Sequence, residues 1–239
     1  MRLLSFLFFL AFFTFNSNAQ SKAYSFKGGL ALGVQTWNNF DRDPLFKYHG
    51  MVAVENADET ERFSVFAQAG YHVRGSALRS NNLIDRFSGD VFRAPTQEFR
   101  FNNIVLALAG KKRQDMNGNA HLYYYFGLRG EYTLKTNLDD YNETNQRVGG
   151  FFPEDQFVRK FNYGAIVGGG FEFPFTDLIQ GVLEFSVNPD FSLQYRQPSV
   201  TVWDPYTGNN RQLGERTIRN ISFEITLGLR FMHIIEYID

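Results

Sequence analysis

Apolar and polar residues alternate along most of this chain, and the pattern is clearest in the stretch His121–Lys135. Every second residue from Leu122 to Leu134 is apolar, aromatic or glycine, whereas the residues between them include Arg129 and Glu131. Successive side chains of a β-strand point to opposite faces of a sheet. The stretch is therefore predicted to form one long strand with an apolar face and a charged face.

The length of this strand indicates a membrane protein. Strands in soluble domains average about five or six residues, whereas a strand that crosses a bilayer at a tilt needs about nine to eleven. Tyr124 and Tyr132 flank the apolar centre of the stretch, as the aromatic girdles of transmembrane barrels do. We therefore interpret His121–Lys135 as a transmembrane strand.

The same alternation predicts eight strands after residue 20. Their ranges are 23–36, 46–56, 62–75, 97–110, 121–135, 159–173, 180–196 and 217–231. The connections 56–61, 111–120 and 174–179 are the shorter ones, and three of the other four are long and polar. Short turns at one end and long loops at the other are typical of outer-membrane barrels. The sequence thus predicts an all-β fold, a single eight-stranded antiparallel up-and-down transmembrane β-barrel, with periplasmic termini and the long loops outside.

Two of these segments depart from clean alternation. In 97–110, a bulge at Asn102–Asn103 would move the outward set from Phe99 and Phe101 to the residues from Ile104 onward. In 180–196, Pro189 removes a donor from the strand ladder, which predicts a bulge or kink around it.

The first 19 residues are predicted to be a cleaved signal peptide. Arg2 precedes the apolar run Leu3–Phe15, and the small residues Ser17 and Ala19 come before the expected cut. The run is too short to cross a membrane as a helix. We therefore divide the chain into a signal peptide at 1–19 and an outer membrane β-barrel domain at 20–239.

Composition excludes several classes of function. The net charge of −1 gives no electrostatic support to a nucleic-acid partner, and the absence of cysteine excludes disulfides, thiolate zinc sites and cysteine nucleophiles. The histidines show no ligand spacing, so neither a metal nor another cofactor is predicted. Aromatic residues reach 17%, and the mean hydropathy of −0.30 excludes a helical membrane bundle but suits a barrel with a polar interior.

The polar faces of the strands are predicted to fill the barrel. Eight strands leave an interior just wide enough for side chains, and buried charges must be paired. We therefore expect a salt-bridged plug rather than an open pore. Its predicted network comprises Arg129, Glu131, Glu172, Glu184, Glu224 and Arg230, and the other charged lining residues are predicted to be Lys27, Glu55, Arg62, His72, Arg74, Lys135, Lys160, Asp190 and Arg196.

No catalytic residues are predicted. Ser76, His72 and Asp85 can be assembled near one rim, but such a set is expected by chance and has no Gly-x-Ser-x-Gly context. His72 with Glu131 or Asp190 could form an acid–base pair, although such residues more often make structural contacts in a lumen. Two alternative functions stay open: a small outer membrane enzyme acting on lipid or peptide at the rim, and a narrow passive channel, which conflicts with the strand count.

The segment Val200–Asn210 holds the predicted surface-binding residues, Trp203 and Tyr206, on either side of a proline turn. Exposed tryptophan and tyrosine are favoured in binding hot spots. A tight turn packed over the barrel mouth is the alternative interpretation. The expected partners are outer membrane lipid and a protein of a cell-envelope assembly, with the oligomeric state left open.

Three segments together resemble the PorT-like outer membrane β-barrel proteins. They are Phe101–Ala109 (FNNIVLALA), Tyr123–Tyr132 (YYYFGLRGEY) and Gly164–Glu172 (GAIVGGGFE). The resemblance covers most of the mature chain and implies an eight-stranded barrel in a Gram-negative outer membrane. Some members of that family serve protein secretion. The resemblance carries over no catalytic residue. The filled lumen and the loop aromatics predict a non-enzymatic scaffold or binding component of a cell-envelope assembly, assemblies linked to secretion included.

Overall fold

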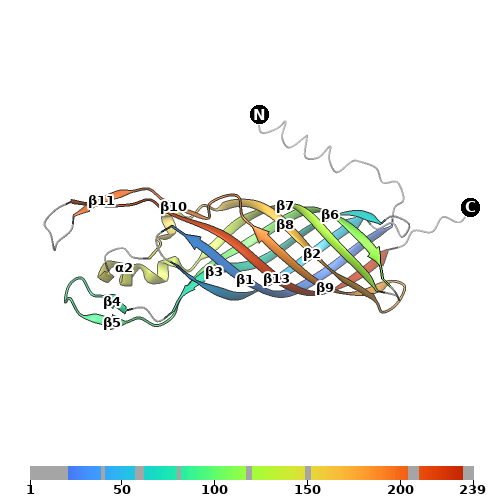
Figure 1. Ribbon diagram of the computed structural model, residues 1–239, viewed down its shortest axis with the longest axis horizontal. Helices are drawn as coiled ribbons and strands as arrows, with labels where there is room; N and C mark the ends of the chain where they lie inside the picture. Colours follow the sequence, from blue (N-terminus) through green and yellow to red (C-terminus); the bar gives the residue numbers. More distant parts are fainter. Residues whose placement is uncertain are drawn as a thin grey trace, which may run out of the picture.

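The computed structural model describes residues 21–38, 41–56, 62–79, 82–116, 120–148, 152–203 and 210–233. The predicted signal peptide at 1–19 and Tyr206 lie outside these residues. Strands make up most of the described chain (Figure 1). No helix among the described residues is both long enough and apolar enough to cross a membrane.

Eight long strands of the described chain form a closed antiparallel barrel (Figure 1). They are β1 (Lys22–Trp37), β2 (Asp43–Asn56), β3 (Phe63–Leu78), β6 (Gln97–Asp115), β7 (His121–Thr136), β8 (Phe161–Pro174), β9 (Ile179–Pro189) and β13 (Arg216–His233). Each of the eight pairs with the next, and β1 pairs with β13 from Lys22 opposite His233 to Trp37 opposite Ile218. The predicted eight-stranded up-and-down barrel is confirmed.

The shorter elements belong to the connections at the end of the barrel opposite to Lys22 and His233 (Figure 1). We call this the loop end, and the other the turn end. The elements are the hairpin of β4 (Asn82–Ile84) and β5 (Val91–Arg93), η1 (Leu138–Tyr141), α2 (Asn142–Val148), η2 (Asp155–Phe157), β10 (Tyr195–Gln197), β11 (Val200–Trp203) and β12 (Asn210–Leu213).

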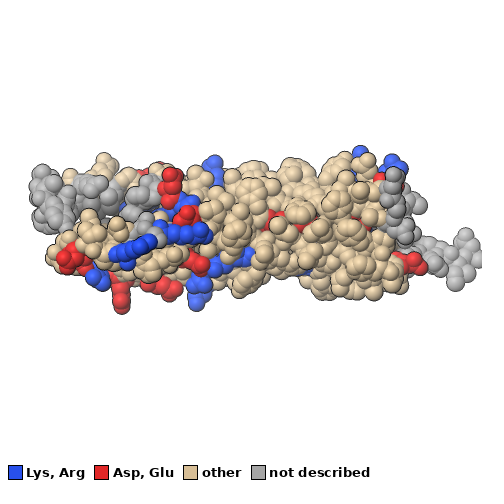
Figure 2. Space-filling model, turned by 60° about the horizontal axis from the view of Figure 1, so that its bottom comes forward, with Lys and Arg blue, Asp and Glu red and all other residues tan. Residues whose placement is uncertain are grey.

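Side chains along the strands alternate between the outer wall and the lumen. On β7, Tyr124, Phe126 and Leu128 are exposed, whereas Tyr123 and Tyr125 between them are buried. The exposed apolar residues of neighbouring strands form a belt around the barrel. Figure 2 shows a mostly uncharged surface over the middle of the barrel, with lysine, arginine and acidic residues gathered toward the two ends.

A register shift lies where β6 meets β7. Asn102 faces Lys135 and Asn103 faces Thr133, so Leu134 is the extra residue and the bulge belongs to β7. Buried and outward residues alternate along β6 without interruption, and Phe99 and Phe101 are buried inside the barrel. The predicted change of the outward set within this strand is therefore wrong, because the extra residue is in the neighbouring strand.

Strand β9 ends at Pro189, seven residues before the predicted end at 196. Proline has no backbone N–H to donate to the ladder, so the strand stops there. The chain rejoins the sheet at β10, where Tyr195 faces Ile218 of β13. Tyr195 follows the exposed Phe185 by an even number of residues, so uninterrupted alternation over 180–196 predicts an outward side chain; Tyr195 is buried instead, and that prediction is wrong.

Four of the predicted lining residues lie outside the lumen, all of them near the ends of strands. Arg62 and Lys160 are exposed residues just before β3 and β8, and Arg196 pairs with the exposed Glu215 at 2.5 Å. Lys135 follows the bulged Leu134, so both of these residues are exposed. Alternation assigns a face only while the strand pairing continues, and here it stops or shifts.

Candidate functional site

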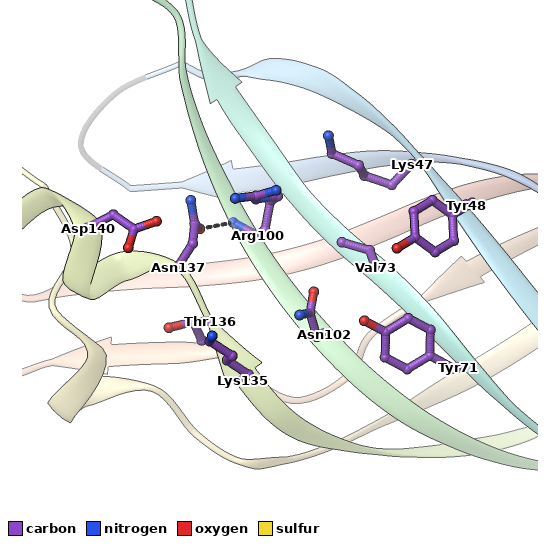
Figure 3. A pocket seen from close by; sticks show the side chains of 10 residues that line it. All are labelled: Lys47, Tyr48, Tyr71, Val73, Arg100, Asn102, Lys135, Thr136, Asn137 and Asp140. Atoms are coloured by element: carbon purple, nitrogen blue, oxygen red, sulfur yellow. Dashed lines mark hydrogen bonds between the residues drawn. The ribbon is translucent and has the colours of Figure 1, made fainter.

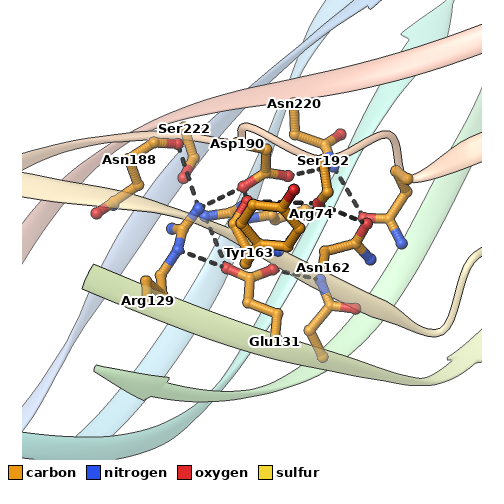
Figure 4. A network of polar contacts seen from close by, with 12 residues as sticks. Arg74, Arg129, Glu131, Asn162, Tyr163, Asn188, Asp190, Ser192, Asn220 and Ser222 are labelled. Carbon is orange, nitrogen blue, oxygen red and sulfur yellow. Dashed lines mark hydrogen bonds and ion pairs between the residues drawn. The ribbon is translucent and has the colours of Figure 1, made fainter. Parts of the chain in front are cut away.

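The middle of the lumen holds a compact set of buried charges, which we call the central network: Arg74, Arg129, Glu131, Asp190, His72 and Glu224. Figure 4 shows the first four of these residues. Arg74 lies 2.9 Å from Glu131 and 2.8 Å from Asp190. Arg129 lies 2.9 Å from Glu131 and 2.5 Å from Asp190. Each guanidinium thus bridges both carboxylates, which closes a ring of four charges across strands β3, β7 and the end of β9.

Within the central network, His72 connects Glu131 of β7 with Glu224 of β13. Its Nε2 lies 3.2 Å from Glu131, and its Nδ1 lies 3.3 Å from Glu224 of β13. Asn103 donates a hydrogen bond to the other oxygen of Glu131 at 3.2 Å. Both nitrogens of the imidazole ring therefore face carboxylates that are themselves enclosed.

A second set of charges fills the lumen toward the turn end; we call it the turn-end network. Its carboxylates Glu55 and Glu172 are each contacted by Lys111, Arg113 and Arg230. The Nε of Arg113 lies 3.0 Å from Glu172, and the Nε of Arg230 lies 3.1 Å from Glu55. The cavity left among these groups measures about 10 Å³, which is at the lower limit for one water molecule.

Glu184 extends the turn-end network toward the aromatic side chains of β7. Lys27 lies 2.7 Å from its carboxylate, and the hydroxyls of Tyr123 and Tyr125 each donate a hydrogen bond to it at 2.9 Å. The two tyrosine rings are stacked, and Phe66 packs edge-on against Tyr125. Rings and charges together occupy the cross-section of the barrel at this level.

The charges of the described lumen balance by sign. Six carboxylates (Glu55, Glu131, Glu172, Glu184, Asp190 and Glu224) stand with six cationic groups (Lys27, Arg74, Lys111, Arg113, Arg129 and Arg230) and with His49 and His72. All six residues of the predicted network, Arg129, Glu131, Glu172, Glu184, Glu224 and Arg230, are among them. A balanced and paired interior needs no mobile counterions, unlike a lumen with an excess of one sign.

At the loop end, the barrel mouth is covered by buried apolar side chains, which we call the mouth cluster: Trp37, Leu78, Leu83, Ala94, Phe99, Phe101, Leu138, Phe152, Tyr195 and Ile218. Some of them come from strand ends and others from the connections. The guanidinium of Arg42 lies 4.1 Å from the ring centre of Trp37 and 5.0 Å from that of Phe99. Burial, with Arg216 nearby, lowers the pKa of Arg42 to about 10.

The hairpin β4–β5 is tied to helix α2 above the mouth. Arg147 lies 2.6 Å from Asp85, and its backbone oxygen accepts a hydrogen bond from the N–H of Arg86 at 2.8 Å. Asp85 also accepts a hydrogen bond from the backbone N–H of Phe87 at 2.9 Å. The Phe87 N–H first, and Arg147 after it, hold the pKa of Asp85 below its ordinary value.

The same hairpin exposes large apolar side chains at the loop end. Ile84, Phe87 and Val91 are 58%, 75% and 66% exposed. Its turn contains Gly89 at a φ of +76°, a conformation that favours glycine. The sequence pattern predicts 76–96 as one polar connection and does not predict this surface, although the apolar residues on either side of Asp85–Gly89 are a signal for a hairpin.

Of the predicted surface residues Trp203 and Tyr206, the structure describes the backbone of Trp203 alone. The backbone of Trp203 pairs with Asn210 in the β11–β12 hairpin. Its side chain and the whole of Tyr206 lie outside what the structure describes.

Ser76, His72 and Asp85 do not assemble into a catalytic set. The Ser76 hydroxyl donates a hydrogen bond to Gln35 at 2.6 Å inside the barrel. His72 faces Glu131 and Glu224, whereas Asp85 lies in the loop-end hairpin and pairs with Arg147. The alternative of an enzyme that uses these three residues therefore has no support in their geometry.

No protein-family model and no curated protein matches this chain, but solved structures do. The outer membrane protein OprG from Pseudomonas aeruginosa is 8% identical with a TM-score of 0.50, covering 90% of this chain and 98% of OprG. Neisserial surface protein A is 11% identical with a TM-score of 0.47, covering 87% of this chain and 97% of the neisserial protein. A major outer membrane protein from Thermus thermophilus is 14% identical with a TM-score of 0.46, covering 89% of this chain and 99% of the Thermus protein. At these identities, the likeness to OprG shows the barrel fold alone.

Proposed function

We propose that the protein is a non-enzymatic outer membrane β-barrel with a filled lumen, acting as a scaffold or binding component of a cell-envelope assembly. The main observation behind this proposal is that the distribution of charged and apolar side chains is the reverse of that in soluble proteins. Paired charges occupy the interior, while large apolar side chains cover the outer wall. Such a molecule is suited to lipid outside, and it offers solutes no open route inside.

The dimensions of the belt support a place in a membrane. Tyr124 and Tyr132 border its apolar centre on β7, eight residues apart and both exposed. Eight residues of strand extend about 27 Å, or about 21 Å in height at a tilt near 40°. That height is close to the apolar band of about 25 Å in known transmembrane barrels. With the long connections of the loop end outside the cell, the turn end, where β1 begins at Lys22 and β13 ends at His233, is periplasmic.

Binding is assigned to the loop end, because loops on a rigid barrel are free to carry recognition. The exposed apolar residues of the β4–β5 hairpin support this assignment, and the salt bridge between Asp85 and Arg147 fixes the hairpin to helix α2. Contacts from Trp203 and Tyr206 stay a prediction, as does the relation to PorT-like proteins and a role in secretion.

Membrane placement and the closed lumen can be tested on the same preparation. We expect the full chain to fractionate with outer membranes, to resist extraction with alkaline carbonate and to migrate differently in gels when unheated. In planar bilayers it should show no steady conductance steps. Recovery of the protein as a soluble periplasmic species, or regular ion conduction, would contradict the proposal.

The binding role requires a test at the hairpin itself. A photo-reactive phenylalanine analogue placed at Phe87 should crosslink one recurrent envelope partner in cells. The same analogue at Phe175, which is 67% exposed in the connection at the turn end, is the matched control and should not capture that partner. Equal capture at both positions, or none at Phe87, would remove the hairpin from the proposal.

A further inference from the structure

A pocket of about 260 Å³ opens on the outer wall of the barrel near the loop end (Figure 3). It spans four neighbouring strands, from β2 through β3 and β6 to β7. Its lining includes the cationic residues Lys47, Arg100 and Lys135 and the phenols of Tyr48 and Tyr71. It lies apart from the central network, because Tyr48, Arg100 and Lys135 are exposed on the outer wall.

Two irregularities of the barrel flank this pocket. The pairing of β2 with β3 shifts between Pro44 and His49, a segment that contains Lys47. On the opposite side, the extra residue Leu134 turns Lys135 to the outer surface. Bulges re-aim side chains next to functional sites. Here each one brings a lysine to the same pocket, at positions where simple alternation would direct it inward.

The cations of the pocket are only partly neutralised. Lys47 lies 2.8 Å from Glu98. Among the described residues, no carboxylate lies within 4 Å of the charged groups of Arg100 or Lys135. The acidic lining residue, Asp140, lies beyond Asn137 as seen from Arg100 (Figure 3). The pocket therefore presents two cationic groups that are available to an anion, with tyrosine hydroxyls close by.

The pocket sits where the apolar belt ends. The outward residues of β6 run from Leu108, Leu106 and Ile104 to Asn102, Arg100 and Glu98, so the change from apolar to charged occurs at the pocket. Tyr71 and Tyr132 pair with Ile104 from either side. A molecule bound to the cations would thus have exposed aliphatic side chains directly below it.

We infer that this pocket binds the phosphate of an anionic lipid headgroup, whose acyl chains lie on the belt below. This inference rests on the proposed membrane placement. Arginine and lysine at the border of a membrane attract anionic lipids, and arginine can bind phosphate through two parallel hydrogen bonds. A lipid fits this site better than a free anion, because the belt adjoining the cations would contact the apolar chains.

The test compares lipids that differ in headgroup charge alone. The full chain, purified in mild detergent, is titrated with phosphatidylglycerol and with phosphatidylcholine of the same acyl chains, and bound lipid is counted by native mass spectrometry. We expect a preference for phosphatidylglycerol. At about fivefold per cationic residue near a membrane surface, the double variant Arg100→Gln/Lys135→Gln should lower it roughly 30-fold.

The matched control removes two cationic residues from the other end of the outer wall. Arg62 and Lys112 are exposed near the turn end, so Arg62→Gln/Lys112→Gln should keep the preference. Arg100→Lys/Lys135→Arg should keep it as well, because the charges remain. Asp140→Asn should raise it, since an anion at the edge of the pocket is removed.

The possible outcomes distinguish a lipid headgroup from free phosphate as the ligand, and they distinguish failure of the lipid site from failure of the proposed membrane placement. Competition by inorganic phosphate at equal concentration would identify a free-anion site and overturn the lipid assignment. An equal loss in both double variants, or no headgroup preference in a protein that inserts into vesicles, would overturn the site while leaving membrane placement intact. Failure of every form to associate with vesicles of either lipid would overturn both.

Discussion

Arg74 donates a hydrogen bond to Asp190 over 2.8 Å, although the two residues are 116 positions apart in the chain. Arg74 lies on β3, and Asp190 directly follows the last residue of β9, so closure of the barrel is what brings them together. Both side chains are buried. The bond shows that the interior is held by pairs that form only once the strands surround it.

Arg74→Ala is expected to lower the free energy of unfolding by about 3–5 kcal/mol, because Glu131 and Asp190 would keep buried charge with one guanidinium fewer. Urea unfolding in lipid vesicles, followed by tryptophan fluorescence, measures the loss. Arg196→Ala is the control, since it breaks an exposed pair with Glu215 that is worth at most about 1 kcal/mol. Equal losses in the two variants would show that the central network contributes no special stability.

Gly127→Ala should prevent normal closure between β6 and β7. A Cβ at this position would lie 2.2 Å from the backbone oxygen of Leu108, a contact that only a shift of the strands can relieve. Gly50→Ala is the control, because its Cβ would have its nearest neighbouring atom, the Lys27 oxygen, at 3.9 Å. Heat-dependent gel migration reports the folded fraction. Wild-type folding of Gly127→Ala would contradict the close approach of the two strands.

The strand periodicity predicts the barrel and most of its two faces, because an alternation of two residues is a local property. Leu128 is exposed and Arg129 buried as the pattern requires. It fails at Lys135, where the outcome depends on how β7 pairs with β6. The alternation likewise predicts most of the charged residues of the plug but not their partners, because the pairing of Arg74 with Asp190 depends on closure of the barrel.

The loop end was the least predictable part. Phe152 and Tyr195 are buried against strand ends that are distant in sequence. Their burial reflects packing over the mouth rather than any local pattern. The exposed hairpin at Ile84–Val91 is hard to predict for a related reason: within the described chain its two short strands pair with each other, over three residues each.

The stability of the contact between the β4–β5 hairpin and α2, which the Asp85 carboxylate makes with Arg147, should depend on pH. The pKa of Asp85 is lowered in the folded state, first by the Phe87 N–H and then by Arg147. A depressed carboxyl pKa gives stability that is present above the unfolded value, near 3.9, and is lost as the pH falls through the folded value. Hydrogen exchange, corrected for intrinsic rates, should therefore show protection of the Phe87 and Gly89 amides at pH 6 that decreases below about pH 4.

Asp85→Asn provides the comparison, because its amide does not titrate. In this variant, protection of the same two amides should be lower at pH 6 and should change little between pH 6 and pH 3. If the wild type keeps its full protection at pH 3, the carboxylate is not what holds the hairpin.

Arginine substitutions at Leu128 and Val91 distinguish a belt that faces lipid from one that faces water. Leu128 lies midway between Tyr124 and Tyr132 and is 65% exposed, whereas Val91 of the loop-end hairpin is 66% exposed. In water, arginine at either position would be nearly neutral, because both side chains are equally accessible. In a bilayer, Leu128→Arg should cost about 2–4 kcal/mol near the midplane, while Val91→Arg should stay within about 0.5 kcal/mol, as surface substitutions usually do. Urea unfolding from phosphatidylcholine vesicles gives both values. Equal tolerance of the two substitutions would mean that the apolar belt contacts something other than the hydrocarbon of a membrane.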